Sequence, residues 1–444
     1  MTSSPTSTPR LPSAERRAPF EHALLEAADI AALSPSSHNC QPWGVAWPTG
    51  RGARRAVERL VDETPDDGHQ APDGISGESG TAGGDSDGSD SDRGDLYRGD
   101  SDEDEYVILA LDRERELTSL PAHAVEMLVS CGAYLQILLR SLALQGWSTD
   151  RIRFVEPLGA GRTGRADFQT GVAYDAGRSL GDTWPVSWSP LCAVRLRRTD
   201  EPDGSPAEIR RTALARRTNR APYRPEAVEP AVLDALSAPS TGVAAGADVT
   251  VRHLVADDDR AAFAGFVARH GGRDFSHRQA WRETYSFVRR DEAEAQARGD
   301  GFPLSQLFGP LSTPRRHALR LALAPTTMSV LRHAGYHRVL ARQLARVVRP
   351  TPAIVAMGLA DASPGVEATI RGGARLAEYW LRATEAGLVL HPVSVVLQHD
   401  DVRKELQDRL GLPGRTFFVS RLGRPLTDFP RSPRRIGARA VRTI

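Results

Sequence analysis

An internal repeat constrains the fold of this chain more than any other feature of the sequence. Gly132-Ala133-Tyr134-Leu135 is followed by Gly146, and Gly373-Ala374-Arg375-Leu376 is followed by Gly387 at the same spacing. Around both stretches, a helix, a Pro-Ser corner, two strands, the Gly-Ala helix and a closing strand recur in the same order. This repetition predicts two similar halves that pack about a pseudo-twofold axis, as in a fused dimer.

The periodicity of apolar residues predicts the elements of each half. In the first half we expect helices over 20–33 and 122–146 and strands over 43–47, 106–111, 152–155 and 191–196. In the second half we expect a helix over 228–236 and strands over 249–251, 354–357 and 417–422.

The same patterns predict the domain boundaries. We expect a loose tail over 1–17, a first half over 18–205 and a second half over 206–444. Residues 62–105 are mostly Asp, Glu, Gly and Ser, so we expect a disordered acidic insertion that cannot bury enough apolar surface to fold. A calcium-binding loop is the alternative, but the terminal Glu spacing of an EF-hand is missing. Residues 260–349 are rich in helical pattern and have no counterpart, which predicts a helical cap.

Charge and cysteine content limit the classes of function. The 444 residues carry a formal net charge of +1, which gives no global attraction to nucleic acid or to an anionic membrane. The three cysteines, Cys40, Cys131 and Cys192, form no CxxC pattern, so we expect a reduced, cytoplasmic protein without disulfides or a metal site. We find no apolar leader and no run of membrane-spanning length, and expect no membrane contact.

The first half contains a polar corner between its first helix and first strand. It reads Pro35-Ser36-Ser37-His38-Asn39-Cys40-Gln41-Pro42-Trp43. Because the two prolines restrict the backbone, the hydroxyl, imidazole and amide groups between them lie on an ordered loop. We interpret this loop as a ligand-facing corner, and the alternative is a well-capped turn. His38 is a candidate acid or base, although a structural turn histidine is the more common role.

The second half contains a copy of this corner that has lost its polar groups. Gly242, Val243, Ala244 and Ala245 stand where the first corner has His38, Asn39, Cys40 and Gln41. A different segment of the second half has Arg216, Thr218 and Arg220 at alternate positions of an extended stretch. Two guanidinium groups and a hydroxyl that face one way suit a phosphate monoester. We therefore expect one ligand per chain, held between the halves.

Together these motifs resemble the nitroreductase family of FMN-dependent oxidoreductases, and in particular its fused, Acg-like branch. The matching stretches are residues 35–43, Ser130-Cys131-Gly132-Ala133, Arg216-Arg217-Thr218-Asn219-Arg220 and the tail Pro433-Arg434-Arg435. The resemblance implies an α+β fold of tandem halves with FMN bound noncovalently between them. It also implies a monomeric pseudo-dimer whose flavin takes hydride from NAD(P)H and reduces a small acceptor such as a nitroaromatic or a quinone.

The resemblance assigns candidate cofactor-binding residues. Arg216, Thr218, Arg220 and Arg434 would hold the phosphate, with Ser432 nearby, and Pro35, Ser36, Ser37 and Asn39 would line the flavin ring from the other half. Ser394 belongs to the loop that the family places beside the reactive edge of the flavin. The flavin, and no protein nucleophile, would carry the redox chemistry.

One departure from the family leaves alternatives for the function. The loop that usually supplies a Glu-Gly pair beside the flavin reads His391-Pro392-Val393-Ser394-Val395-Val396 here. The Acg-like branch shares this loss, and its flavin is covered by a lid, a role that residues 260–349 could fill. Flavin sequestration with little turnover is therefore one alternative, and a biosynthetic FMN-dependent dehydrogenase is another.

Overall fold

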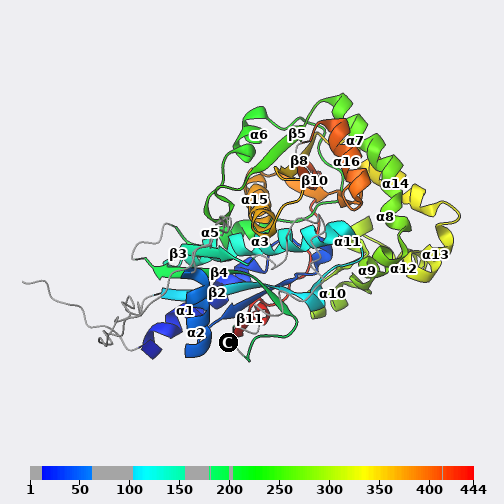
Figure 1. Ribbon diagram of the computed structural model, residues 1–444. Helices are drawn as coiled ribbons and strands as arrows, with labels where there is room; N and C mark the ends of the chain where they lie inside the picture. The colour runs from blue at the N-terminus through cyan, green and yellow to red at the C-terminus, as the bar shows by residue number, and fades with distance from the viewer. Residues whose placement is uncertain (1–12, 63–103, 156–179, 181, 200–203, 413) are drawn as a thin grey trace, which may run out of the picture.

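Two sheets lie on opposite sides of a central pair of long helices (Figure 1). The computed structural model describes residues 13–62, 104–155, 180, 182–199, 204–412 and 414–444, and omits side chains before Pro19. The first sheet contains β1 (Trp43–Trp47), β2 (Asp104–Asp112), β3 (Trp147–Phe154), β4 (Trp188–Arg198) and β11 (Val441–Thr443). The second sheet contains β5 (Val249–Leu254), β8 (Ala353–Leu359), β9 (Val389–Pro392) and β10 (Arg415–Gly423).

The two sheets have the same strand order. The first runs β11-β1-β2-β4-β3 and the second runs β5-β8-β10-β9. Apart from the added β11, every neighbouring pair in both sheets is antiparallel. The α+β class is confirmed, and the elements that the sequence pattern paired occupy equivalent places in the two sheets.

The central helices α3 (Pro121–Ala143) and α15 (Val366–Glu385) cross at the repeated glycines. A Cβ atom on Gly132 would lie 2.0 Å from the Ile370 carbonyl oxygen, and one on Gly373 would lie 2.1 Å from that of Val129. Each glycine therefore meets the residue three positions before the other glycine. This reciprocal contact is the arrangement that a twofold axis through the crossing would produce.

The central strands of each sheet are buried on both faces, which explains why β2 and β8 contain continuous apolar runs. In β2, Val107 and Leu109 face α1 (Ser13–Ala31) and α3, whereas Ile108 and Ala110 face α2 (Arg51–Asp62). Helix α3 is long and apolar enough to cross a membrane by length and composition, contrary to the sequence expectation, but 83% of its most apolar window is buried in the protein.

The predicted tail and both ends of the predicted acidic insertion differ from the structure. Helix α1 begins at Ser13, inside the predicted tail, and α2 includes Asp62. Strand β2 begins at Asp104, because Arg54, Arg195 and Arg197 surround the acidic side chains of Asp104 and Glu105. The rest of the predicted acidic insertion, residues 63–103, lies outside the described residues.

The C-terminal strand does not join the sheet of its own half. β11 pairs in parallel with β1 of the first sheet, with Val441 opposite Val45. The preceding η5 (Gly437–Ala440) packs on α1, where a Cβ on Gly437 would lie 2.3 Å from the Ala28 carbonyl carbon. The tail thus crosses from the second half to the first, which the predicted boundaries did not include.

Only part of the predicted cap is separate from the second sheet, because its two outer helices belong to the core of that sheet. Its outer helices, α7 (Asp257–His270) and α14 (Tyr336–Val348), cover the second sheet through Phe263, Phe266 and Val348. Between them lie α8 (Gly272–Ser276), α9 (Arg278–Ser286), α10 (Glu292–Arg298), α11 (Ser305–Phe308), α12 (Thr313–Leu323) and α13 (Pro325–Leu331), with the short strands β6 (Val288–Arg289) and β7 (Phe302–Pro303). We call residues 271–335 the cap. Phe275, Trp281 and Tyr285 pack in its own small core, as predicted.

The remaining helices flank these elements. They are η1 (Ser37–Asn39), η2 (Arg113–Arg115), α5 (Pro206–Ala215), α6 (Pro230–Ser237), η3 (Gly242–Ala244), η4 (Ser394–Val396) and α16 (Asp400–Leu410). Helices α6 and α16 cover opposite faces of the second sheet, and α5 leads from the first half into the arginine-rich segment.

Candidate functional site

The polar corner has an unusual backbone. His38, Asn39 and Gln41 have φ values of 50°, 54° and 53°, and among the described residues they alone combine a positive φ with a side chain. The left-handed region costs a non-glycine residue free energy, so surrounding contacts must hold these three in place. Ser36 contributes by accepting a hydrogen bond from the Gln41 amide at 3.1 Å.

Two other parts of the chain hold this corner through its amide side chains. Asn39 donates to the carbonyl oxygens of Gly301 at 2.9 Å and Pro433 at 2.8 Å. Gln41 donates to the Gly299 carbonyl oxygen at 2.7 Å. The cap and the C-terminal tail therefore both meet the corner, and the strained loop lies beneath them.

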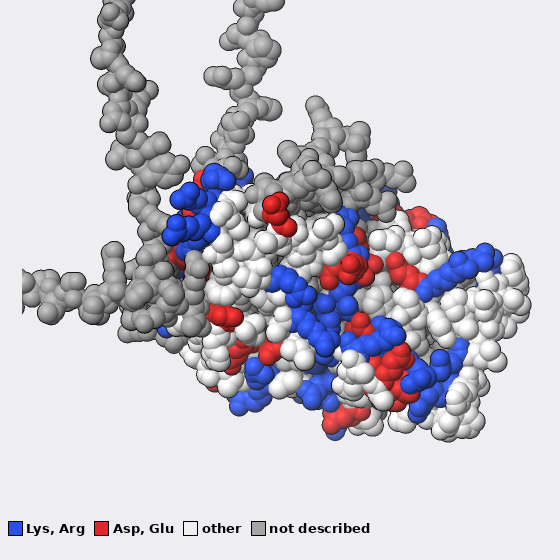
Figure 2. All heavy atoms as spheres, turned by 90° about the horizontal axis from the view of Figure 1, so that it is seen from below, with Lys and Arg blue, Asp and Glu red and all other residues white. Residues whose placement is uncertain are grey.

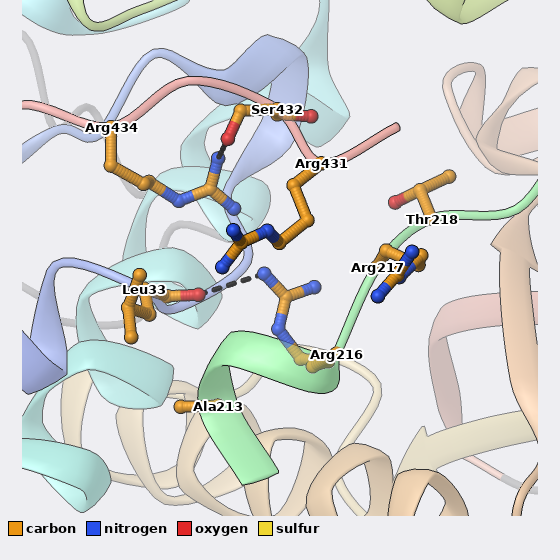
Figure 3. Close-up of a pocket in the computed structure, with 8 residues that line it drawn as sticks. All are labelled: Leu33, Ala213, Arg216, Arg217, Thr218, Arg431, Ser432 and Arg434. Carbon is orange, nitrogen blue, oxygen red and sulfur yellow. Dashed lines mark hydrogen bonds between the residues drawn. The ribbon is translucent and has the colours of Figure 1, made fainter. Parts of the chain in front are cut away.

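A cavity beside the corner is lined by arginines from the second half (Figure 3). Its lining residues are Leu33, Ala213, Arg216, Arg217, Thr218, Arg431, Ser432 and Arg434. Arg216 donates to the Leu33 carbonyl oxygen at 2.7 Å, and Arg434 donates to Asn39 Oδ1 at 2.7 Å. These two bonds join the arginine cluster to the first half on both sides of the corner.

The cavity has a strong excess of positive charge and no carboxylate among its lining residues. Burial and the charge of Arg434 lower the pKa of Arg216 well below its usual value, and burial and Arg431 lower the pKa of Arg434 to about 10. The Nε atoms of both arginines are buried without a hydrogen-bond partner. By contrast, arginines on the face shown in Figure 2 are interleaved with acidic side chains. An anion would satisfy this cavity.

The structure brings together some of the predicted site residues but not all of them. Arg216, Thr218, Ser432 and Arg434 line one cavity. Arg220 does not line it, because its buried guanidinium group donates to the carbonyl oxygen of Gln306 in the cap at 3.0 Å. Sequence reasoning missed Arg217 and Arg431. Both stand among other arginines, and no sequence feature distinguished them from their neighbours.

The remaining predicted residues do not line this cavity. Pro35, Ser36 and Ser37 belong to the corner, and Ser394 begins η4 in the second half. Asn39 reaches the cavity through its bond to Arg434. The flavin-lining roles of these five residues stay predictions.

A partly buried polar cluster links the corner to α3 and the cap. Ser37 Oγ donates to Glu126 Oε2 at 2.5 Å, and His38 bonds to both Ser37 and Thr284 at 3.1 Å. Burial, followed by the neighbouring His123, lowers the pKa of His38 to about 4, so the ring is neutral near pH 7. Sequence reasoning missed Glu126, although it lies one helical turn before the Ser130 of the matching Ser-Cys-Gly-Ala stretch.

Glu283 of the cap fastens this cluster to the start of α3. Its carboxylate accepts from the amides of Thr118 at 2.7 Å and Ser119 at 3.2 Å and lies 2.9 Å from His123 Nδ1. Burial alone would raise the pKa of Glu283, but His123 and the two amides lower it to about 2. Burial alone would lower the pKa of His123, but Glu283 and nearby acidic groups raise it.

Replacing Glu283 by glutamine should therefore loosen the cap in a pH-dependent way. Losing these charged hydrogen bonds should lower the free energy of unfolding by about 1–3 kcal/mol. The part of this stabilisation that comes from His123, whose folded pKa is raised, is fully present below the unfolded pKa of about 6.5. It is lost as pH rises through the folded pKa. The share from Glu283, whose pKa is depressed, is lost as pH falls below about 4.

We expect the difference between wild type and Glu283→Gln in urea unfolding to be largest near pH 6 and smaller near pH 9. Hydrogen exchange in α9 should show the same trend. Glu292→Gln, at an exposed cap carboxylate that bonds Ser305, is the matched control. A difference that grows between pH 6 and pH 9 would contradict this assignment.

The corner of the second half is filled by side chains. Arg371 donates to the carbonyl oxygens of Val243 and Ala245, and Gln136 Oε1 accepts from the Ala244 amide at 3.3 Å. The two corners align as 3-10 turns, so Gly242 corresponds to Ser37, one position earlier than the sequence pairing with His38. Gly242, Val243 and Ala244 therefore lack the polar side chains of Ser37, His38 and Asn39, while Thr241 keeps a hydroxyl group at the position of Ser36.

The three cysteines play no part in the site. All are free and buried, and burial raises the pKa of Cys192 to about 12 and those of Cys40 and Cys131 above their usual range. Among the described residues, no group of histidine, cysteine and acidic side chains could hold a metal ion.

Comparison with known proteins gives one long sequence match. The chain is 28% identical over 427 residues to a probable NAD(P)H nitroreductase, PigM, of Serratia sp. (strain ATCC 39006), and the match covers 96% of this chain and 94% of the relative. The chain is nitroreductase-like. No protein-family model matches it.

Solved structures similar to this nitroreductase-like chain include two that cover about half of it. The FMN-dependent nitroreductase NfnB from Mycobacterium smegmatis, in complex with NADPH, covers 51% of this chain and 93% of its own, with 15% identity and a TM-score of 0.32. Iodotyrosine deiodinase bound to FMN and 3-iodo-L-tyrosine covers 51% and 94%, with 12% identity and a TM-score of 0.29.

Proposed function

We propose that this chain is an FMN-dependent oxidoreductase that takes hydride from NAD(P)H and reduces a small acceptor such as a nitroaromatic or a quinone. The observation that carries the proposal is the arginine cavity beside the corner. The long match to a probable NAD(P)H nitroreductase supports it.

The cavity suits the phosphate of FMN. A phosphate monoester offers acceptor oxygens and negative charge, which are what the unpartnered Nε atoms of Arg216 and Arg434 require. Thr218 and Ser432 line the same cavity and add hydroxyl groups. In this proposal these four residues hold the phosphate, while Arg220, Ser394 and the corner residues Pro35, Ser36, Ser37 and Asn39 lie along the remainder of the cofactor.

The bound flavin would supply hydride transfer between donor and acceptor. The protein contributes binding, orientation and a buried environment. Neutral His38 and the carboxylate of Glu126 lie beneath the cap, where Gly299 and Gly301 close over Asn39 and Gln41. The cap thus covers part of the corner.

The two halves suggest a fused dimer with a single working site, as in the Acg-like branch. The support is the shared strand order and the reciprocal contacts at Gly132 and Gly373. At the second corner, Arg371 and Gln136 occupy the backbone groups of Gly242–Ala244. We therefore propose one FMN per chain.

Anaerobic mixing with NADPH or NADH tests the proposed activity. The purified protein should be yellow with one FMN per chain, and the reduced nicotinamide should bleach the flavin absorbance. Adding a quinone should then restore the colour. Protein that takes up no FMN would contradict the proposal.

Flavin sequestration is the second candidate, and the contacts of the cap favour it. The cap closes the corner through Asn39 and Gln41, and Arg115 of the first half binds Asp300 of the cap at 2.7 Å. In that case FMN would bind, nicotinamide would leave the colour unchanged and dithionite would still bleach it. A biosynthetic dehydrogenase would instead be bleached by its own organic substrate.

A further inference from the structure

The partly buried polar cluster contains an unbroken line of hydrogen bonds from the cap to α3. Thr284 Oγ1 lies 3.1 Å from His38 Nε2, and His38 Nδ1 lies 3.1 Å from Ser37 Oγ. Ser37 Oγ in turn lies 2.5 Å from Glu126 Oε2. Four groups that exchange protons therefore follow one another at bonding distance.

The negative charge of Glu126 and the number of protons on each group determine which partner donates in each of these hydrogen bonds. The carboxylate of Glu126 can only accept, so the hydroxyl proton of Ser37 points to it. Ser37 Oγ must then accept from His38 Nδ1–H, which leaves Nε2 as the acceptor of the Thr284 hydroxyl proton. Every donor therefore points from the cap toward Glu126, and one concerted step would move a proton in that direction.

Each end of the line is suited to its role. Thr284 lies half-buried on α9, near the surface of the cap, whereas Gln398 donates to the second oxygen of Glu126 at 2.7 Å and fixes the carboxylate. Gln398 lies two residues after η4, just beyond the loop in which the family's Glu-Gly pair is missing. Glu126 thus places a carboxylate between the corner and that loop.

His38 is held neutral by the groups that surround it. It faces His123 on α3 and, through charge, Glu283 of the cap and Arg220 of the arginine segment, and Phe287 and Phe302 pack near its ring. Burial is the main reason that its pKa is lowered to about 4. A neutral imidazole can pass a proton by gaining one at Nε2 as it loses one at Nδ1, without storing charge.

We propose that Thr284, His38, Ser37 and Glu126 form a proton relay. It carries protons from the cap surface to Glu126, which passes them to the acceptor as the acceptor is reduced. The inference rests on the proposed function. Reduction of a quinone by NAD(P)H transfers one hydride and takes up one further proton, giving the hydroquinone and NAD(P)⁺. The relay supplies that further proton from water, and its residues act through one another as positioning groups.

The tautomer of His38 tests the relay without any turnover. Nitrogen NMR of the flavin-free protein labelled at histidine should show His38 protonated at Nδ1 only, with no titration down to about pH 5. His253 is the reference signal outside the relay, because it is partly buried, its pKa is also lowered to about 4, and its ring bonds Tyr379 at 2.8 Å. Protonation of His38 at Nε2, or titration near its ordinary pKa, would overturn the proposal.

Single variants test the role of the relay in the flavin-loaded enzyme. Thr284→Val should slow acceptor reduction by about tenfold or more, within the usual range for general acid catalysis, and remove its solvent isotope effect. Thr284→Ser should restore both. Glu126→Gln should have the same effect as Thr284→Val. Glu378→Gln, at a buried carboxylate that accepts from Gln136 on the opposite side of the helix pair, is the matched control and should change neither.

The possible failures are distinguishable. If the protein binds FMN and NAD(P)H bleaches it, yet both relay variants behave like Glu378→Gln, the relay is wrong and the proposed function stands. If no FMN binds or NAD(P)H does not bleach it, the proposed activity fails, and the relay loses its role with it. Slower flavin bleaching by NAD(P)H in Thr284→Val would also contradict the relay, because hydride donation needs no proton from it.

Discussion

Replacing Gly373 by alanine should lower the free energy of unfolding by about 3 kcal/mol, since the new methyl group has no space at the helix crossing. Its Cβ would lie 2.1 Å from a backbone oxygen of α3, so α3 and α15 would have to separate. Gly132→Ala should cost a similar amount for the reciprocal reason. Urea unfolding of the purified variants measures both effects.

Gly372 on the same helix is the matched control. A Cβ there would meet the flexible Leu359 side chain at 3.1 Å, and no backbone atom is among its near contacts. Gly372→Ala should therefore stay within about 1 kcal/mol of wild type, because alanine also favours the helix. If Gly373→Ala were as stable as Gly372→Ala, the helices would not cross as described.

The double variant Arg216→Ala with Arg434→Ala should leave the protein folded but colourless. Each hydrogen-bonded charge contributes about 1.5–3 kcal/mol, so losing both should weaken FMN binding by about two to four orders of magnitude. The fold should tolerate the change, because burial and mutual repulsion make these two arginines costly without an anion. Titration of flavin fluorescence measures the affinity.

Arg375→Ala provides the control for losing a buried arginine beside a corner. Arg375 donates to the Leu236 carbonyl oxygen at 2.9 Å, as Arg216 does to that of Leu33, but it belongs to the corner whose polar groups are absent. This variant should bind FMN as wild type does. Equal loss of flavin in both variants would show that the effect is structural and would remove support for the phosphate site.

Much of the fold could be predicted because the repeated elements have recognisable short sequence patterns. The Gly-Ala pairs lie at the crossing because a larger side chain cannot fit at Gly132 or Gly373, and the central strands are continuous apolar runs because both of their faces are covered. The site could be predicted in part for a similar reason. Arg216 and Thr218 keep a short spacing that places both on one cavity.

Contacts between distant segments could not be predicted from one sequence. The pairing of β11 with β1 depends on an open sheet edge some four hundred residues earlier. The assignment of 260–349 as a cap was too wide, because Phe263 and Phe266 carry the same apolar signal whether they face a cap core or a sheet. The contacts of Arg220 with Gln306, of Glu283 with the start of α3 and of Thr284 with the corner depend on the folded arrangement of the cap.

A crystal structure of the FMN-loaded protein tests the central claim most directly. The account predicts one flavin per chain, with its phosphate against the guanidinium groups of Arg216 and Arg434 and its ring on the side of the corner that holds Ser37. A phosphate bound elsewhere, or a second flavin at the corner around Gly242, would contradict it.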